Sequence, residues 1–260
     1  MTAYLRNVWR LRHFWMALVR SDLRRRYRRS VIGVGWSLLH PIAMTIVLCT
    51  AFGQLFNTDF RTYGPMLLAG LVTWNFICAV MNQGCQSFLQ GESYIRQYPA
   101  PLAIYPLRTV LGAAVHFLMG LAVVLLFVWA VNGFDNLPAL LSLPLAVLLL
   151  FVFGWSLAVL AGTINVMFQD TQHLTEVLLQ ILFYLTPIIY SADFLRERKM
   201  AWFLQLNPLA SYLDLVRVPI LQGRLPGVEA YAIAVSTALV TLTLAAWILS
   251  RIERRIIFYL

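Results

Sequence analysis

Charged residues are scarce in this sequence. Only 12% of its 260 residues are Asp, Glu, Lys or Arg, and Lys199 is the single lysine. Soluble globular domains carry about 25% charged residues. The apolar share is 60%, and the mean hydropathy is +0.74. These values exclude an ordinary soluble domain and indicate an integral membrane protein.

Nucleotide-binding and disulfide patterns are also missing. No segment matches G-x-x-x-x-G-K-[ST], the loop whose backbone amides hold nucleotide phosphates, so we expect this chain to bind no nucleotide itself. Cysteine occurs only at Cys49, Cys78 and Cys85, each within an apolar stretch. An odd number without extracellular spacing argues against a disulfide framework. We expect these cysteines to be small packing residues in helices.

Groups suited to catalysis or ion transport are few. The spacing of Asp170, His173 and Glu176 could place them on one helical face, toward a metal. We favour the alternative, that Asp170 caps a helix and the carboxylates complement its N-terminal dipole. We expect His40 and His116 to be buried and hydrogen-bonded across helices rather than to relay protons. The chain is therefore expected to hold no catalytic residue, no metal and no cofactor.

The basic residues are concentrated at the N-terminus. Nine of the 20 lie before Val31, where Asp22 is the one acidic residue, so the first 30 residues carry +8 of the net charge of +9. Because cytoplasmic flanks retain Arg and Lys, the chain is expected to start in the cytoplasm. A single basic segment of helix size favours an anionic membrane surface over nucleic acid as its partner. The residues expected at that surface are Arg24, Arg25, Arg26, Arg28 and Arg29.

Apolar runs predict the membrane topology. A hydrocarbon core about 30 Å thick needs about 20 helical residues, and six segments qualify. An even number returns the C-terminus, with Arg251, Arg254 and Arg255, to the cytoplasm. The fifth segment is the shortest and contains Pro187, so we expect it to kink or to stop early. The approximate limits are 34–56, 65–85, 107–131, 140–165, 174–191 and 230–250.

Two of the connections are long. Residues 86–106 form an inner loop in which polar and aromatic residues alternate between prolines. Residues 192–229 form an outer segment whose apolar pieces are too short to span the membrane. We therefore expect a re-entrant or interfacial hairpin, broken at Asn207-Pro208 and buried against protein. Arg217 is one of several arginines there that violate the charge rule.

Residues 26–41 read RYRRSVIGVGWSLLHP. This stretch resembles a signature, R-Y-x-x-S-x-L-G-x-x-W-x-x-x-x-P, of the permease subunits of ABC polysaccharide exporters, the Wzm, KpsM and TagG proteins. Ile32 stands in the place of the leucine, and Gln169-Asp170 stands where the family usually has Arg-Asp. Order and spacing hold over nearly the whole chain. The other similar segments are 68–76, 168–174, 184–190 and 207–210.

The resemblance implies one half of a transporter. Two copies of a six-span subunit would form one channel, and each would dock a separate ATPase subunit that binds ATP and Mg. It also implies a cytoplasmic amphipathic interface helix in a domain 1–33 (helix about 3–29), before a permease domain 34–260. The inner loop would supply a coupling helix, about 89–104, and the outer segment a gate, about 193–225. Coupling would fall to Gly91, Glu92, Tyr94 and Arg96, and gating to Asn207 and Pro208.

Aromatic residues offer a way to hold a sliding glycan. Sugar rings have apolar faces that stack on aromatic rings without strict register. Such rings on the first, second and fifth spans could line a path, although interfacial belts and lipid-facing positions also use aromatics. The candidates are Phe52, Phe56, Trp74, Phe76, Phe183, Tyr184 and Tyr190.

The sequence thus predicts a transporter permease and not an enzyme. It is expected in the bacterial inner (cytoplasmic) membrane with both termini cytoplasmic, exporting a lipid-linked surface polysaccharide of the O-antigen kind. A drug or small-lipid exporter of the same permease class is an alternative that the aromatic content and the opening motif disfavour. A polytopic transferase is a second alternative. It would need carboxylates gathered at one membrane face, where only Asp170 and Glu176 come close.

Overall fold

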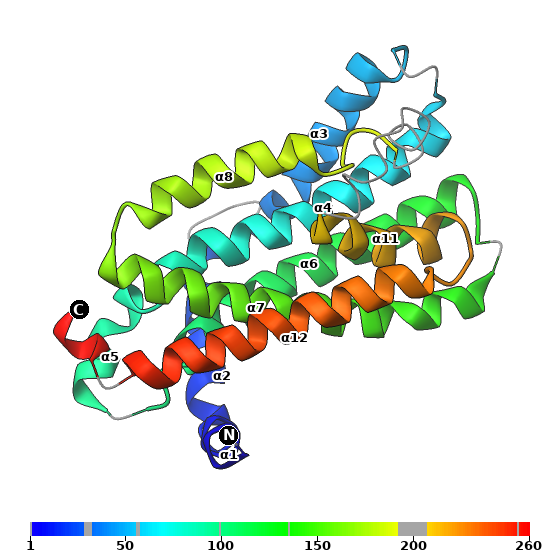
Figure 1. Ribbon diagram of the computed structural model, residues 1–260. Helices are drawn as coiled ribbons and strands as arrows, with labels where there is room; N and C mark the ends of the chain where they lie inside the picture. Colours follow the sequence, from blue (N-terminus) through cyan, green and yellow to red (C-terminus); the bar gives the residue numbers. More distant parts are fainter. Residues whose placement is uncertain are drawn as a thin grey trace.

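The structure of the protein, a computed structural model, describes residues 2–28, 33–55, 58–98, 100–134, 136–191, 207–253 and 255–260. Within these ranges every regular element is a helix (Figure 1), which confirms the predicted all-α class. Arg29, Phe56 and the first part of the outer segment, 192–206, lie outside the described residues.

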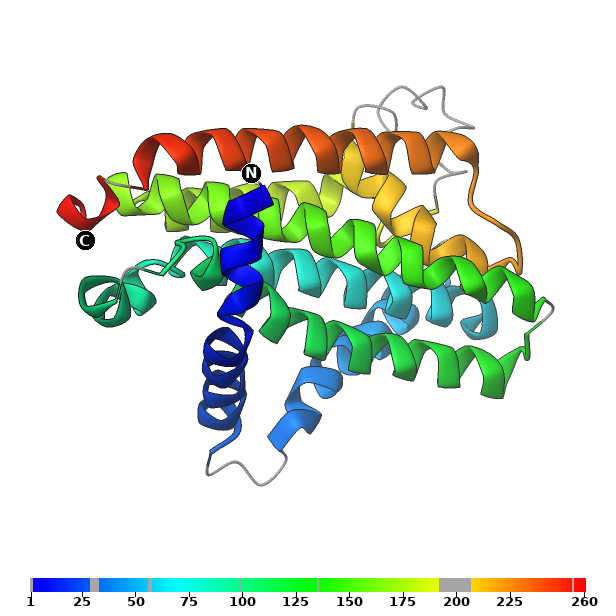
Figure 2. The same cartoon turned by 90° about the horizontal axis from the view of Figure 1, so that it is seen from below.

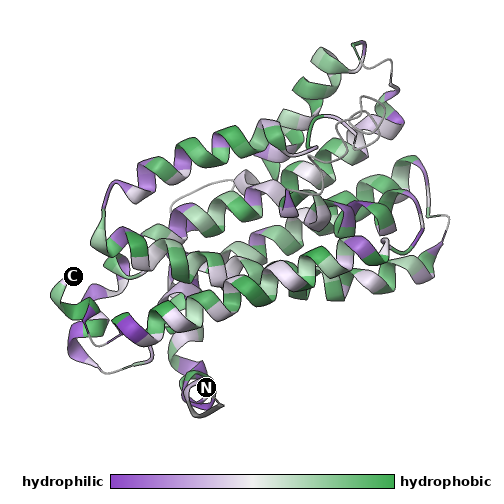
Figure 3. Cartoon of the chain, in the orientation of Figure 1, coloured by the Kyte–Doolittle hydropathy of each residue, from purple (hydrophilic) through white to green (hydrophobic). Residues whose placement is uncertain are grey.

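Four helices of the described chain are long and apolar enough to cross a membrane. They lie side by side, and Figure 3 shows their largely hydrophobic composition. Helix α4 packs against α6 and α7, and α7 packs along α12; α4 is the most buried of the four. These helices are α4 (Phe60–Cys85), α6 (Ile104–Val131), α7 (Leu143–Met167, continuing the 3-10 helix η3, Leu137–Ser142) and α12 (Val228–Ile252).

Two shorter helices pack on α4 and correspond to the expected first and fifth spans. Helix α3 (Trp36–Phe52), which follows η1 (Gly33–Gly35), has 17 residues, and α8 (Thr171–Leu185) has 15. At 1.5 Å per residue they extend roughly 25 and 22 Å, less than the ~30 Å hydrocarbon core. Helix α8 stops before Pro187, as predicted, because a residue that precedes proline disfavours helical backbone; Thr186 has φ −96° and ψ 139°. Six crossings remain a prediction.

The N-terminal basic segment forms two helices instead of the expected single one. Helices α1 (Thr2–Arg10) and α2 (Arg12–Tyr27) are separated at Leu11, whose φ of −88° and ψ of 19° are not α-helical. Both helices run across the long helices and not along them (Figure 2). A helix in that orientation lies parallel to the membrane plane, which suits a surface helix.

The two termini and the inner loop meet at one end of the bundle. The Tyr4 hydroxyl donates to Glu253 Oε1 at 3.0 Å and accepts from the Ala103 amide at 3.3 Å. The Leu102 amide donates to the same Glu253 oxygen at 3.3 Å. Burial raises the pKa of Tyr4, so the phenol keeps the proton that it donates. The inner loop contains η2 (Leu89–Gly91) and α5 (Glu92–Gln97), and the C-terminus contains η4 (Ile256–Phe258).

Helix α11 (Pro208–Leu221) packs against α4, α7 and α12. Ten of its 14 residues are buried, and the ring of Tyr212 stacks on Phe153 at 4.6 Å between ring centres. This part of the outer segment is therefore buried against protein, as the sequence predicts.

Candidate functional site

A groove of about 250 Å³ lies between α4 and α8, and we call it the α4–α8 groove. One wall is aromatic: the ring centres of Trp74 and Phe183 are 5.8 Å apart, and those of Phe183 and Tyr184 are 5.4 Å apart. Trp74 is 6% exposed and Tyr184 is 63% exposed. The three rings therefore lead from the core of the bundle to its surface.

Polar groups also line the α4–α8 groove, namely Asn82 on α4 and Glu176 and Gln180 on α8. The Asn82 Oδ1 atom is buried and has no hydrogen-bond partner in the described part of the chain. A buried acceptor without a partner costs about 1–3 kcal/mol, so a hydroxyl that donates to it would be stabilised. Aromatic faces beside amide and carboxylate groups match a sugar ring, which has apolar faces and hydroxyl edges.

Phe76 lies away from the α4–α8 groove. It follows Trp74 by two residues, so its side chain points to a different face of α4. It is 3% exposed and packs 5.3 Å from Phe117 of α6, ring centre to ring centre. The sequence grouped Phe76 with Trp74 in one path, whereas the structure places it in the core.

The remaining aromatic candidates are at the outer end of α3 and after α8. Phe52 is half-buried in the last turn of α3. The Tyr190 hydroxyl donates to the Tyr184 carbonyl at 3.0 Å. Phe56 lies outside the described residues. The structure therefore brings Trp74, Phe183 and Tyr184 together and places Tyr190 beside them through its hydrogen bond.

A buried arginine of α11 holds the turn that follows α8. The Arg217 side chain is 7% exposed and donates to the backbone carbonyls of Met66 at 3.1 Å, Ile188 at 2.9 Å and Pro187. A methyl group added at Gly70 would lie 2.0 Å from the Arg217 guanidinium, so this glycine gives the side chain its space. We call these contacts the Arg217 clamp. It joins α4, α11 and the segment 187–188.

The two predicted gate residues lie next to the Arg217 clamp. Asn207 caps α11, because its Oδ1 accepts from the Leu209 amide at 3.1 Å, and Pro208 occupies the first position of the helix. The Asn207 Nδ2 donates to Thr186 Oγ1 at 3.0 Å. The start of α11 is thus bound to the end of α8. A gating role for these residues stays a prediction.

The predicted coupling segment is shorter than expected, with helical structure over 89–97 and not to 104. Ile95 is buried, and the Tyr94 ring meets Phe14 of α2 edge-on at 5.9 Å. A Cβ at Gly91 would lie 2.5 Å from the Tyr105 ring, so a larger residue would displace α5 from α6. One face of α5 is therefore fixed to the bundle.

The other face of α5 carries charge. Arg96 Nε donates to Glu92 Oε1 at 2.8 Å, one helical turn away, and both side chains are about half exposed. A rigidly held helix with an exposed charged face can transmit a push from a partner to the long helices.

Helix α2 is fixed to α6 by an ion pair. Asp22 accepts from Arg108 through both carboxylate oxygens, one of them 2.7 Å from Nη2. Arg108 is 5% exposed, and the Asp22 side chain is 32% exposed. Arg25 also donates to Asp22, at 2.8 Å. The one acid of the N-terminal segment therefore serves to dock α2.

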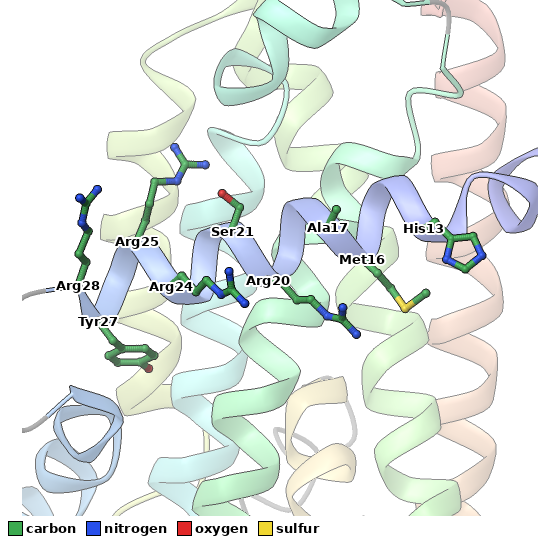
Figure 4. Close-up of a pocket in the computed structure, with 9 residues that line it drawn as sticks. All are labelled: His13, Met16, Ala17, Arg20, Ser21, Arg24, Arg25, Tyr27 and Arg28. Atoms are coloured by element: carbon green, nitrogen blue, oxygen red, sulfur yellow. The ribbon is translucent and has the colours of Figure 1, made fainter.

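The N-terminal arginines do not form a single surface. Arg24, Arg25 and Arg28 line a hollow along α2, shown in Figure 4. Tyr27 points from α2 toward α3 in the same view, and Arg26 lines a separate pocket between α3, α4 and α6. Sequence reasoning treated these residues as one basic patch, but the docking of α2 turns Arg26 and Tyr27 toward the bundle.

Comparison with known proteins agrees with this arrangement of helices. A model of the ABC-2 type transporter family matches residues 13–221, from α2 to the end of α11. The chain belongs to the ABC-2 type transporter family. It is 26% identical over 198 residues to the O-antigen export system permease protein RfbA of Klebsiella pneumoniae, covering 76% of each chain. RfbA of Myxococcus xanthus is 24% identical over 230 residues, 88% of each chain.

A third relative of this ABC-2 type transporter is the polysialic acid transport protein KpsM of Escherichia coli. It is 23% identical over 214 residues, which cover 80% of this chain and 81% of KpsM. These matches confirm the resemblance to ABC permeases, and the similar proteins named here are permease or transport proteins. Together with the long apolar helices, they make this ABC-2 type protein a multi-pass membrane protein.

The histidines and acids behave partly as predicted in this ABC-2 type protein. His116 is half-buried and hydrogen-bonded to Tyr27 of α2, whereas His40 is exposed. Asp170 occupies the capping position of α8, but its side chain makes no capping hydrogen bond. The His173 Nδ1 atom lies 3.8 Å from Glu176 Oε2, and both side chains are exposed. No group of three metal-binding side chains occurs among the described residues.

Sequence reasoning missed the most constrained arginines of this ABC-2 type protein. Arg108 falls within the expected span 107–131 without being singled out, and Arg217 is noted only as an exception to the charge rule. A signal existed for both, because a lone cation within an apolar stretch is rarely tolerated unless it has partners. What the sequence could not indicate was the identity of those partners.

Proposed function

We propose that this chain is the transmembrane subunit of an ATP-driven exporter that carries a lipid-linked, O-antigen-like polysaccharide across the bacterial cytoplasmic membrane. The observation that carries the proposal is the α4–α8 groove, which combines three aromatic rings with amide groups. The named functions of the relatives, O-antigen export and polysialic acid transport, point to the same cargo class. The amide groups of Asn82 and Gln180 in this groove favour a hydroxyl-rich cargo over the cargo of a drug or small-lipid exporter.

The energy for transport comes from a separate subunit in this proposal. The sequence contains no phosphate-binding loop, so ATP and Mg bind to a partner ATPase. Two copies of that ATPase serve two copies of this chain. The exposed face of α5, held to α2 through Tyr94 and to α6 through Gly91, is the docking surface.

Six crossings are the topology that fits the ends of the chain. Tyr4 and Glu253 are hydrogen-bonded, so α1 and the end of α12 lie at the same end of the bundle. An even number of crossings produces that arrangement. The arginine content of α2 supports a cytoplasmic position for this end. Helices α3 and α8 supply the two crossings beyond the four long helices.

The channel forms between two copies of the chain. The long helices of one subunit pack into a filled core around α4. Helices α3 and α8 lie beside this core and, like the outer faces of α6, α7 and α12, keep apolar side chains exposed, such as Val47 at 56% and Val177 at 56%. A two-fold dimer that pairs these faces would place the α4–α8 groove of each copy along a shared path.

Reconstitution tests the proposed function. The purified chain alone should hydrolyse no ATP, and co-expression with the ATPase of an O-antigen export system should produce export of a lipid-linked glycan in a strain that lacks its own permease. Steady ATP hydrolysis by the chain without a partner, or transport of small lipids and no glycan by the complex, would contradict the proposal.

Tyr184→Ala should slow glycan export roughly two- to tenfold, since an aromatic contact is worth about 0.5–1.5 kcal/mol. Tyr184 is 63% exposed, so its removal should leave folding unchanged. Tyr184→Phe keeps the ring and should keep most of the activity. Trp129→Ala is the matched control, because Trp129 is 65% exposed on α6, away from the groove. Equal export rates for Tyr184→Ala and Trp129→Ala would argue against an aromatic path.

Charge reversal at Glu92 or Arg96 should uncouple ATP hydrolysis from export while membrane insertion stays normal. The pair is half exposed, so it contributes little to stability. The double variant Glu92→Arg/Arg96→Glu restores the ion pair with its direction reversed. If the ATPase recognises these charges, the double variant stays uncoupled; if only the pair matters, it recovers. Unchanged export in both single reversals would exclude a coupling role.

A single cysteine at Val47 should cross-link two copies of the chain. In a two-fold dimer, a residue near the axis faces its own copy, and a disulfide requires Cβ atoms about 3.8 Å apart. Cys49, Cys78 and Cys85 are free thiols and are first replaced by alanine. The control is Val240→Cys, 63% exposed on α12. The same test is then made with short-arm cross-linking reagents and with cysteines at neighbouring positions of α3. If none of these cysteines cross-links two copies of a protein that still exports, α3 is excluded as the interface.

A further inference from the structure

A second pocket lies away from the α4–α8 groove, where the end of α2 meets α3, α4 and α6. Its volume is about 260 Å³, and we call it the α2–α6 pocket. It is partly open to the exterior, since Trp36 at its edge is 57% exposed. Its polar lining residues are Arg26, Ser37, His40, Asn75 and His116.

Hydrogen bonds fix the walls of the α2–α6 pocket. The Tyr27 hydroxyl lies 2.8 Å from Ser37 Oγ and 2.9 Å from His116 Nδ1. Ser37 Oγ lies 3.2 Å from the same nitrogen, so one network joins α2, α3 and α6. One turn earlier on α2, Asp22 is bound to Arg108 of α6. The position of Arg26 is therefore set by contacts on both sides of it.

The lining of the α2–α6 pocket is cationic. No Asp or Glu is among the described residues that line it. Arg26 forms no ion pair with any described residue, whereas Arg25 beside it is paired with Asp22. The Arg26 guanidinium, the His40 ring and the Asn75 amide offer donors without a competing carboxylate. This set suits an anion with several oxygen atoms, and a phosphate matches the donor geometry of the arginine guanidinium.

The position and the volume of the α2–α6 pocket further restrict the kind of anion that it can bind. Helix α2 lies across the bundle (Figure 2), as a helix on the membrane surface does. We infer from this orientation that its end lies near the depth of lipid headgroups. Trp36 beside the pocket is typical of that interfacial depth. A pocket of about 260 Å³ is below the usual range for a drug-sized ligand and is large enough for a small headgroup.

We propose that the α2–α6 pocket binds the phosphate or diphosphate that joins the exported glycan to its lipid. Arg26 supplies the charge, and His40 and Asn75 donate to the remaining oxygens. The lipid chain leaves past Trp36 along the exposed face of α3. This assignment rests on the proposed function, which supplies a lipid-linked cargo. It gives the exporter a site for the lipid end of the cargo, separate from the α4–α8 groove that contacts the sugars.

Binding of farnesyl diphosphate, a short lipid diphosphate, tests the α2–α6 pocket without transport. Full-length protein in zwitterionic nanodiscs should bind it, and Arg26→Gln should weaken binding about tenfold or more, as expected for losing a charge-assisted hydrogen bond. Arg26→Lys should restore much of the affinity. Arg24→Gln is the matched control, with the same change of charge on the same helix outside this pocket. His40→Ala, at an exposed position, gives a second variant that should fold normally.

The arms of the experiment separate the possible sources of the phosphate. Persistence of binding when phosphatidylglycerol replaces part of the zwitterionic lipid supports the cargo headgroup. Displacement by phosphatidylglycerol at equal concentration assigns the pocket to bilayer lipid and overturns the proposal. Wild-type affinity in both Arg26→Gln and His40→Ala also overturns it, while leaving the proposed function standing. Arg26-dependent binding in a chain that supports no glycan export would contradict the proposed function and retain the phosphate site.

Discussion

Replacing Arg217 with methionine should lower the melting temperature by roughly 5–10 °C. The substitution removes the guanidinium that donates to the carbonyls of Met66, Pro187 and Ile188, and losing hydrogen bonds to a buried charged group costs roughly 3 kcal/mol. Thermal unfolding in detergent, followed by size-exclusion chromatography, measures the shift. Arg224→Met is the control, because Arg224 is an exposed arginine of the same outer segment.

Gly70→Ala should lower the melting temperature by part of the amount expected for Arg217→Met, because the added methyl group would lie 2.0 Å from the Arg217 guanidinium. In the Arg217→Met background the same substitution should add little, since the shorter side chain leaves room. Such non-additivity is expected for residues in direct contact. Additive losses from Gly70→Ala and Arg217→Met would show that the Arg217 clamp does not stabilise the outer end of the bundle in this way.

Asp22→Ala should release α2 from the bundle. It leaves the charge of Arg108, which is 5% exposed, without its partner, and an uncompensated buried charge costs about 3–5 kcal/mol. Because α2 is rich in arginine, its release should expose sites to trypsin, and limited proteolysis in membranes measures the change. Arg108→Met should be milder, since Asp22 is 32% exposed and keeps Arg25 as a partner.

The controls for α2 follow from the same geometry. Arg25→Gln removes an arginine that is 65% exposed, and a surface pair contributes at most about 1 kcal/mol. It should leave proteolysis unchanged. The double variant Asp22→Ala/Arg108→Met should be more stable than Asp22→Ala alone. Equal protection of α2 in Asp22→Ala and wild type would show that the ion pair does not dock this helix.

Helix positions followed from the sequence with small errors at the ends. The apolar run expected at 107–131 is α6, and the run expected at 230–250 is α12. Pro187 correctly predicted the early end of α8, because proline acts on the residue before it. The break at Leu11 was not predicted, since no proline or glycine marks it and only packing against the bundle favours it.

The candidate site was predictable by residue type but not by grouping. Trp74, Phe183 and Tyr184 were chosen as aromatic residues on the right helices, and the structure brings them together. Phe76 was chosen for the same reason and lies in the core. The sequence did not indicate Asn82, because the role of an amide within an apolar run depends on which helix packs against it.

The sequence by itself determined the all-α class, the positions of the long helices, the basic start of the chain and its family. These properties depend on hydropathy and motifs along the chain. Tertiary structure alone decided that Arg217 holds a turn, that Asp22 docks α2 and that Arg26 faces a pocket. The partners of Arg217 and Asp22 lie as many as 151 and 86 residues away. Only the packing of one helix face against another brings such distant groups within hydrogen-bonding distance. Local sequence patterns do not indicate which helix faces pack together.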